Sequence, residues 1–416
     1  MESMKSSGID FAILIPLNWQ VRRLKYIACI TTGNKDTINA SDNGEYPFFV
    51  RSPKILRIDS YSYDGEAVLL PGEGDVGKIF HYINGKFDFH QRVYCLYDFM
   101  DFRGKFLWYY LSQTFINEID KGTNKTTVES LRLPMLQNFT VCSPPLLEQC
   151  AIVAFLDARC EHVNNIIFDI ENQINILKKY KKALITETVI KGLEKTASMK
   201  RSGIDWIGDI PSEWIVKNLR FLGTFQNGIS KDGDSFGSGS PFVSYSDVYN
   251  NFTLPKIVDG LVESNKNEKR LYSVQNEDVF FTRTSETIEE IGFASICRET
   301  IYEATFAGFL IRFRPTGKEL LPGYAIYYFR ADALRNYFVK EMTIVTRASL
   351  GQNLLKNLPV LLPPHDEQRA IAEFLDNKCA EIDNLIAKKQ KAIETMQQYR
   401  KSIIYEYVTG KKRVES

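Results

Sequence analysis

The stretch PPLLEQCAIVAFLD at residues 144–157 returns as PPHDEQRAIAEFLD at residues 363–376. Proline is accepted at the first positions of an α-helix but not in its interior, so each Pro-Pro pair predicts a helix start. Glu148 and Glu367 then fall in the first turn, where the helix dipole stabilises a negative charge. The sequence therefore predicts two helices that begin with the same motif.

The chain repeats itself in two blocks. Residues 4–33 return at 199–228 with 12 of 30 aligned positions identical, and residues 144–190 return at 363–409 with 18 of 47 identical. The region between the two blocks is about 24 residues longer in the second copy. Repeats of this kind indicate one structural unit used twice. We expect a common scaffold that carries two variable inserts of different size.

Apolar side chains continue along both predicted helices at heptad spacing, which favours a helix-helix seam. The expected seam consists of Val163, Ile167, Ile170, Ile174, Leu177 and Leu184 in the first copy and Ile382, Ile386, Ile393, Met396 and Ile403 in the second. Lys389 replaces Ile170 in the repeat, which predicts a local opening or a lysine with its stem along the seam. Each helix spans about 45 residues, or roughly 65 to 70 Å. Because the halves are repeats, the natural closure is an antiparallel pair with pseudo-twofold symmetry. The alternative is that each seam packs only on its own domain.

The first repeated block contains an Ile-Pro pair followed three residues later by tryptophan, at Pro16 with Trp19 and at Pro211 with Trp214. This spacing predicts a turn anchored by one large apolar ring.

Composition narrows the class of protein. At 416 residues, with 44% hydrophobic and 25% charged residues, the chain is long enough for two domains and has the composition of a globular protein. No apolar run of about 18 residues and no export signal is visible, so we expect a cytoplasmic protein. Seven cysteines without a C-x-x-C pair predict reduced thiols, and four histidines without ligand spacing predict no metal site.

Two motifs suggest catalysis or nucleotide binding at first sight. Residues 72–78, GEGDVGK, match G-x-G-x-x-G, but the following β-rich run with Asn84-Gly85 predicts a strand and hairpin rather than the required helix. Ser143-Pro-Pro-Leu146 resembles the tetrad of amino-methyltransferases but lacks its aromatic residue. We interpret the glycines as a loop and the prolines as a helix start, and we expect no catalytic residues.

The chain resembles, over essentially its whole length, the specificity subunit of type I restriction-modification systems. The resemblance lies in the order of its parts: a variable domain, a Pro-Pro-x-x-Glu-Gln helix, a second variable domain and a second such helix. The resemblance implies an α+β fold with two α/β target recognition domains, at 1–143 and 196–362, and two long antiparallel helices, at 144–195 and 363–416, that form a coiled coil. It also implies a bipartite asymmetric double-stranded DNA target, two methyltransferase subunits and further restriction (translocase) subunits as partners. No cofactor is expected on this chain, whereas S-adenosylmethionine, ATP and magnesium are expected on the partner subunits.

Base-specific contacts require side chains that reach base edges, whereas phosphate contacts mainly position a protein. The expected DNA-binding residues in the first domain are Lys35, Arg51, Lys54, Lys78, Lys86, His90, Gln91, Arg92, Asn124 and Lys125. Those expected in the second domain are Lys231, Ser244, Tyr245, Lys266, Arg283, Thr284, Ser285 and Arg347. For any one lysine or arginine, the alternative is a solvated surface charge. Gln91-Arg92 and Arg283-Thr284-Ser285 stand out because they adjoin aromatic strands.

The net charge of +1 is low for a protein that binds the DNA backbone without partners. We therefore expect either that the basic residues gather on one face or that partner subunits supply much of the positive charge. Two other functions remain open from the residues. One is a stand-alone DNA methyltransferase or nuclease with its own specificity domains, and the other is a helical scaffold whose domains bind only protein.

Overall fold

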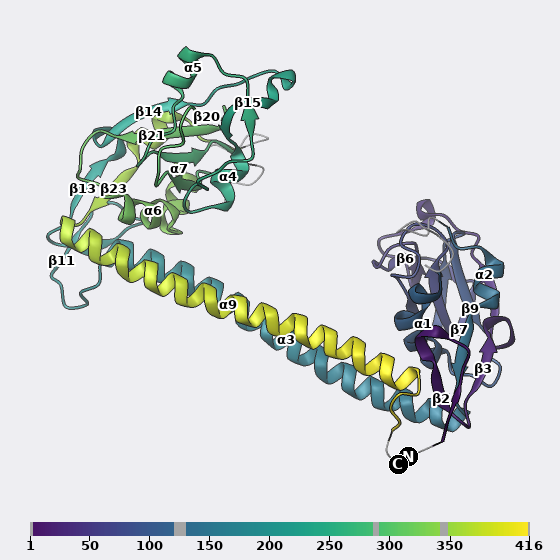
Figure 1. Ribbon diagram of the computed structural model, residues 1–416. Helices are drawn as coiled ribbons and strands as arrows, with labels where there is room; N and C mark the ends of the chain where they lie inside the picture. The colour runs from purple at the N-terminus through teal and green to yellow at the C-terminus, as the bar shows by residue number, and fades with distance from the viewer. Residues whose placement is uncertain (1–2, 120–129, 286–290, 342–347, 415–416) are drawn as a thin grey trace. The chain divides into compact units, whose positions relative to one another are not determined.

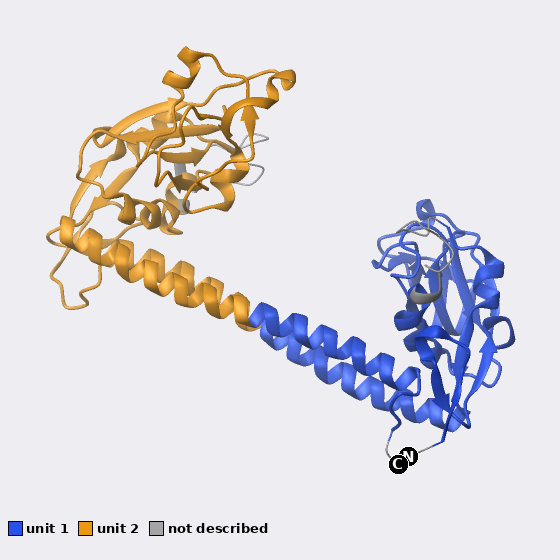
Figure 2. Cartoon of the chain, viewed as in Figure 1, with its two compact units in different colours: residues 1–171, 389–416 blue, residues 172–388 orange. Residues whose placement is uncertain are grey.

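Two long helices begin directly after the Pro-Pro pairs: α3, Leu146–Lys191, with 46 residues, and α9, His365–Val408, with 44 residues. The computed structural model describes residues 3–119, 130–285, 291–341 and 348–414. These residues form two compact units, residues 1–171 with 389–416 and residues 172–388 (Figure 2). Both helices pass from one unit into the other, so each unit contains the beginning of one helix and the end of the other (Figure 1).

The first unit is built on a six-stranded sheet with the order β4-β9-β7-β8-β5-β6. Most neighbours are antiparallel, and β5 and β8 are parallel. Two small antiparallel pairs, β1-β2 and β3-β10, flank it. The elements are β1 Met4–Ser6, β2 Leu14–Pro16, β3 Gln20–Arg23, β4 Cys29–Thr32, β5 Tyr46–Phe49, β6 Leu56–Ile58, β7 Tyr63–Pro71, β8 His81–Phe89, β9 Val93–Tyr97, α1 Gly104–Ile119, α2 Leu133–Asn138 and β10 Thr140–Ser143.

The second unit repeats this plan with a sheet of order β14-β21-β17-β19 and a three-stranded sheet of order β16-β15-β20. The antiparallel pairs β11-β12, β13-β23 and β18-β22 complete it. The strands are β11 Met199–Arg201, β12 Asp209–Pro211, β13 Ile215–Asn218, β14 Gly223–Asn227, β15 Phe236–Val243, β16 Leu261–Val262, β17 Val279–Thr282, β18 Thr284–Ser285, β19 Ala294–Ile296, β20 Thr305–Phe306, β21 Leu310–Pro315, β22 Ala348–Ser349 and β23 Pro359–Leu362. The helices are α4 Tyr245–Asn250, α5 Lys266–Leu271, α6 Pro322–Arg330, α7 Ala333–Glu341 and α8 Gln352–Asn357.

The repeated motif fastens each helix to its domain. Gln149 and Gln368 are fully buried, and each donates through Nε2 to the carbonyl of the first proline of its Pro-Pro pair at 2.9 Å. Their Oε1 atoms accept the backbone N–H of Arg103 and of Leu321, just before α1 and α6, at 2.8 Å. Buried amides that satisfy backbone groups in this way fix local geometry, since each unmade bond is costly.

The aspartates that end the motif have the same role in both copies. Tyr109 of α1 donates to Asp157 at 2.8 Å, and Tyr327 of α6 donates to Asp376 at 2.5 Å. The predicted Pro-Trp turn is also confirmed, because Trp19 and Trp214 are fully buried and donate their backbone N–H to Pro16 and Pro211 at 3.0 Å.

Within each unit the helix segments are antiparallel. In the first unit, the Glu148 carboxylate pairs with Arg413 at 2.9 Å, the Phe155 and Tyr407 rings lie 4.5 Å apart between centroids, and Arg400 donates to Asn164. In the second unit, Lys181 pairs with Asp383 at 2.6 Å. In the first unit, the partner numbers fall as the residue numbers rise along α3, so the two chain segments there are antiparallel, as expected.

Every expected seam residue is buried or half-buried, and Lys389 is half-buried as well. At their ends, both helices also pack on the globular domains, as in the alternative of packing on a domain. Ile152, Leu156, Ile403, Ile404 and Val408 belong to the core of the first unit. The core of the second unit contains Ile185, Val189, Ile190, Ile371 and Leu375. Both helices are therefore parts of both hydrophobic cores.

One local expectation is wrong. Asn84-Gly85 does not form a hairpin turn but lies inside β8, where Gly85 faces Gly65 of β7. The chain reverses instead between Pro71 and His81, through the glycine-rich segment 72–78. That segment leads into a strand, as the β-rich run after it predicted.

Candidate nucleic-acid interface

Most of the expected DNA-binding residues of the first unit lie on four connections that converge next to the six-stranded sheet. These connections follow β4, β5, β7 and β8. The backbone N–H of His90 donates to Phe49 at 2.9 Å, that of Gln91 donates to Lys35 at 2.8 Å, and that of Gly72 donates to Arg92 at 2.9 Å. These bonds bring the four segments together in what we call the polar junction, which consists of residues 33–37, 50–54, 72–78 and 90–92. A cavity of about 320 Å³ opens among these segments.

The carboxylate of Glu73 holds two arginines in this cluster. Its Oε2 lies 2.7 Å from Nη1 of Arg92 and 3.6 Å from Nη1 of Arg51. All three side chains remain between 41% and 51% exposed, so the guanidinium groups are oriented and still accessible. An oriented and accessible guanidinium group can donate two hydrogen bonds to O6 and N7 of guanine or to a phosphate.

Asp36 organises the other donors. Its Oδ2 accepts from Nε2 of Gln91 at 2.9 Å and lies 3.7 Å from Nε2 of His90. Hydrogen bonds from Thr37 hold the pKa of Asp36 below its ordinary value, so the carboxylate is charged at neutral pH. The glutamine amide is thereby fixed next to Arg92, and glutamine is a side chain suited to reading adenine.

His90 is buried, with 4% of its surface exposed, and its Nδ1 accepts the backbone N–H of Arg92 at 3.0 Å. Burial is the main cause that lowers its pKa. The neutral imidazole then carries its proton on Nε2, toward Asp36. His90 therefore supports the loop that presents Gln91 and Arg92 rather than facing outward itself.

The remaining candidates of the first unit differ in position. Lys78 pairs with Asp75 at 3.0 Å in the glycine-rich loop, and the backbone N–H of Lys54 donates to Ser52 near the cavity. Lys86 lies over the ring of Tyr61, 4.7 Å from its centroid. Asn124 and Lys125 lie outside the described residues.

The second unit builds the same junction with different side chains. The backbone N–H of Arg283 donates to Phe309 at 2.8 Å and its carbonyl accepts from Leu350 at 2.7 Å, as Gly72 donates to Arg92 at 2.9 Å and accepts from Leu131 at 2.7 Å. Ala307 donates to Val243 at 3.0 Å, as His90 does to Phe49. Arg283 thus occupies the position of Gly72.

Close backbone approach makes glycine necessary at one corner of each junction. A Cβ on Gly33 would lie 1.9 Å from the carbonyl oxygen of Phe89, and a Cβ on Gly228 would lie 1.9 Å from that of Ala307. Any side chain would collide with backbone at both places. The glycine that ends the first repeated block therefore lets β4 and β14 lead into the two junctions.

Four of the expected residues of the second unit lie next to this junction. Arg283 precedes β18 and Thr284 begins it, and Ser244 and Tyr245 follow β15, as Val50 and Arg51 follow β5. Ser244 caps α4, because its hydroxyl accepts the backbone N–H of Asp247 at 3.3 Å and donates to the Asp247 carboxylate at 2.7 Å. Tyr245 stacks on Tyr249. Lys231 pairs with Glu268 at 2.6 Å, and Lys266 begins α5. The side chain of Ser285 and all of Arg347 lie outside the described residues.

Sequence reasoning missed the carboxylates Asp36 and Glu73. It selected hydrogen-bond donors for DNA and passed over acidic residues, which repel phosphate. Their spacing from Arg92 along the chain carried no signal, because the contacts depend on pairing between distant strands. Among the described residues, no three His, Cys, Asp or Glu side chains gather as a metal site, and no helix combines the length and apolar character needed to cross a membrane.

Two mixed α/β domains, each with a polar junction and each completed by the same pair of helices, define an internally duplicated recognition protein. The family model described as the type I restriction modification DNA specificity domain matches twice, at residues 16–177 and 211–395. The chain belongs to this family.

Named relatives agree with the family. The chain is 24% identical to the type I restriction enzyme MjaVIII specificity subunit of Methanocaldococcus jannaschii, over 97% of this chain and 95% of that protein. It is 30% identical over 172 residues to the EcoDI specificity subunit of Escherichia coli, a match that covers 41% of this chain and 38% of that protein.

Solved structures share the fold. A chain from a type I R-M system superposes with a TM-score of 0.71 at 17% identity, covering 96% of this chain and 99% of the other. The HsdS subunit from Thermoanaerobacter tengcongensis gives a TM-score of 0.51 at 16% identity, covering 96% and 98%.

Proposed function

We propose that this chain is the non-catalytic DNA-recognition subunit of a type I restriction-modification complex. It reads a bipartite, asymmetric target in double-stranded DNA, with one half-site for each domain. It binds no cofactor itself and assembles with two methyltransferase subunits and with restriction subunits, which carry S-adenosylmethionine, ATP and magnesium. Family membership and the names of the relatives support this assignment.

One observation supports the proposal that the two half-sites of the target differ. The two junctions share their backbone hydrogen bonds but not their side chains, because Gly72 and Arg92 of the first stand where the second has Arg283 and Phe309. Since base edges are read by side chains, equivalent loops with different donors predict different half-sites.

The domain boundaries that we propose for exchange are 1–143 and 196–362, joined by the helices at 144–195 and 363–416. Replacing residues 34–126 by the corresponding insert of a relative should change one half of the methylated motif and leave the other half unchanged. Methylation sequencing of a host that carries the complete system measures both halves together. A change in both halves would contradict separate reading by the two domains.

Arg92 tests whether the first junction reads bases or only phosphates. For a base contact, Arg92→Ala should weaken binding to the proper target by about 1 to 3 kcal/mol, or roughly five- to 150-fold, and should relax preference at one base pair. For a phosphate contact, all sequences would lose affinity equally, and the salt slope would fall by about 1. Lys25→Ala, at an exposed lysine that lies over the ring of Tyr26 and is not among the expected DNA-binding residues, is the control for loss of a positive charge.

The non-catalytic assignment has its own test. The purified chain should give no methylation or cleavage of DNA with S-adenosylmethionine and magnesium, and addition of the methyltransferase subunit should restore methylation. Turnover by the chain alone would establish the stand-alone enzyme instead.

A further inference from the structure

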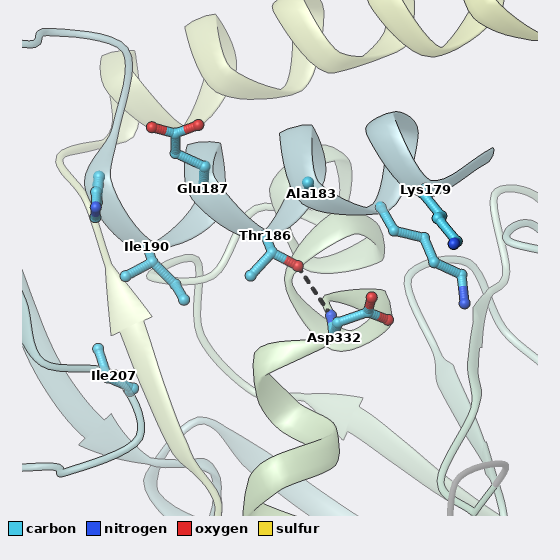
Figure 3. Close-up of a pocket in the computed structure, with 9 residues that line it drawn as sticks. Lys179, Ala183, Thr186, Glu187, Ile190, Ile207 and Asp332 are labelled. Carbon is cyan, nitrogen blue, oxygen red and sulfur yellow. Dashed lines mark hydrogen bonds between the residues drawn. The ribbon is translucent and has the colours of Figure 1, made fainter. Parts of the chain in front are cut away.

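A cleft of about 650 Å³ opens in the second unit beside the last turns of α3 (Figure 3). Its apolar floor consists of Ala183, Ile190 and Ile207, and Thr186 accepts the backbone N–H of Asp332 at 3.0 Å on one wall. Clefts of this size accommodate several side chains of a ligand or a peptide. The cleft lies on helix and hairpin residues and not on the loops of the polar junction.

Three exposed lysines line the cleft: Lys179, Lys182 and Lys191. Among the described residues, none of the three forms an ion pair within the chain. Glu187 and Asp332 also line the cleft, but the carboxylate of Glu187 points away from Thr186 and Asp332 (Figure 3). The surface therefore offers uncompensated positive charge at some points and negative charge at others.

The first unit fills the equivalent place with its own side chains. The internal repeat aligns Thr186 with Tyr405, whose hydroxyl donates to the carbonyl of Phe11. Lys411 lies over the Tyr405 ring, 4.6 Å from its centroid. Glu406, the counterpart of Glu187, pairs with Lys412 at 2.9 Å. Tyr405 and Glu406 thus have partners within the first unit, whereas their counterparts Thr186 and Glu187 line a cleft in the second unit.

We propose that this cleft binds an acidic segment of a protein partner, with an apolar side chain on the Ile190 and Ile207 floor and carboxylates on Lys179 and Lys182. At the corresponding positions of the first unit, Tyr405 and Glu406 have partners within the chain. This inference rests on the proposed function only in that the chain works within a complex of several protein subunits. The internal duplication alone does not predict this docking position.

Charge and shape favour a protein segment over DNA. A phosphate backbone presents regularly spaced negative charge, which would meet Asp332 unfavourably, and it has no side chain for the apolar floor. A peptide can alternate carboxylates with an apolar residue and can place a donor near Asp332.

Photocrosslinking in the assembled complex identifies the occupant. We would place p-benzoylphenylalanine at Ala183 and, as the matched control, at its exposed counterpart Ser402. The probe at residue 183 should crosslink to one segment in which carboxylates flank an apolar residue, and the probe at 402 should not reach that segment. A crosslink to DNA, the same segment at both positions, or no crosslink at 183 would overturn the proposal.

Charge reversal measures the contribution of the lysines. The Lys179→Glu and Lys182→Glu double variant should weaken binding of the crosslinked subunit about five- to tenfold, with loss of its salt dependence, whereas Lys401→Glu at the equivalent position should not. Gel shift with target DNA should be unchanged for both variants in the isolated chain. Equal loss in both variants would contradict a single site. Loss of DNA recognition in the unmodified chain would contradict the proposed function but would leave the docking result standing.

Discussion

Replacing Gln368 by leucine should destabilise the second unit strongly. The side chain is fully buried and forms three hydrogen bonds, accepting from the Leu321 N–H at 2.8 Å and donating to the carbonyls of Glu319 at 2.8 Å and Pro363 at 2.9 Å. Leucine has a similar volume, so the cost is mainly that of buried backbone groups left without partners. At about 1 to 3 kcal/mol for an unsatisfied group, and less for carbonyls that relax toward water, the total is roughly 3 to 5 kcal/mol.

Differential scanning calorimetry of the full chain measures this loss. For a unit of about 200 residues, 1 kcal/mol shifts Tm by roughly 2 to 4 °C, so the transition of the second unit should fall by roughly 6 to 20 °C. Gln149→Leu removes two bonds and should cost about 1 kcal/mol less in the first unit. Gln398→Leu, at an exposed position of α9, is the control. If Gln368→Leu shifted Tm no more than this control, the buried amide would not hold the helix to its domain.

Two further expectations concern pH and one hydrogen bond. Burial lowers the pKa of His81 and His90 in the folded chain. The contribution of the two neutral histidines to stability should therefore be complete above about pH 6.5, the ordinary histidine pKa, and should be lost as pH falls below that value. In the double variant His81→Asn with His90→Asn, Tm should depend less on pH between about pH 7 and pH 5. Trp214→Phe removes a 2.8 Å hydrogen bond from Nε1 to Glu367, whereas Nε1 of Trp19 has no hydrogen-bond partner among the described residues. Trp214→Phe should therefore cost about 1.5 to 3 kcal/mol more than Trp19→Phe in denaturant titrations. Equal costs would show that only ring volume matters.

The helices and the duplication could be predicted from the sequence because both depend on local patterns. A proline pair, a first-turn glutamate and heptad spacing are short-range signals, and they located the starts of α3 and α9 to within a turn. The end of α9 at Val408 lies eight residues before the expected boundary at 416. The roles of Gln149 and Asp157 could not be predicted, because their partners Arg103 and Tyr109 lie more than forty residues away in the chain.

The polar junction shows the same limit. The donors Gln91 and Arg92 were recognisable as residue types, but the carboxylates that orient them are brought close only by strand pairing. Asn84-Gly85 misled for a related reason. Strands β7 and β8 are nine residues long and pair through this dipeptide, with Gly85 opposite Gly65 and Asn84 opposite Glu66, so long-range pairing decides its conformation.

The order in which the ribosome delivers this chain has a cost for the first unit. Its core needs Ile403, Ile404 and Val408, which emerge only after residues 172–388 have been made. At about 5 to 20 residues per second, the nascent N-terminal domain waits on the order of 10 to 40 s with that part of its apolar surface uncovered. Truncation before Ile403 should therefore leave the first unit, which is synthesised earliest, prone to aggregation.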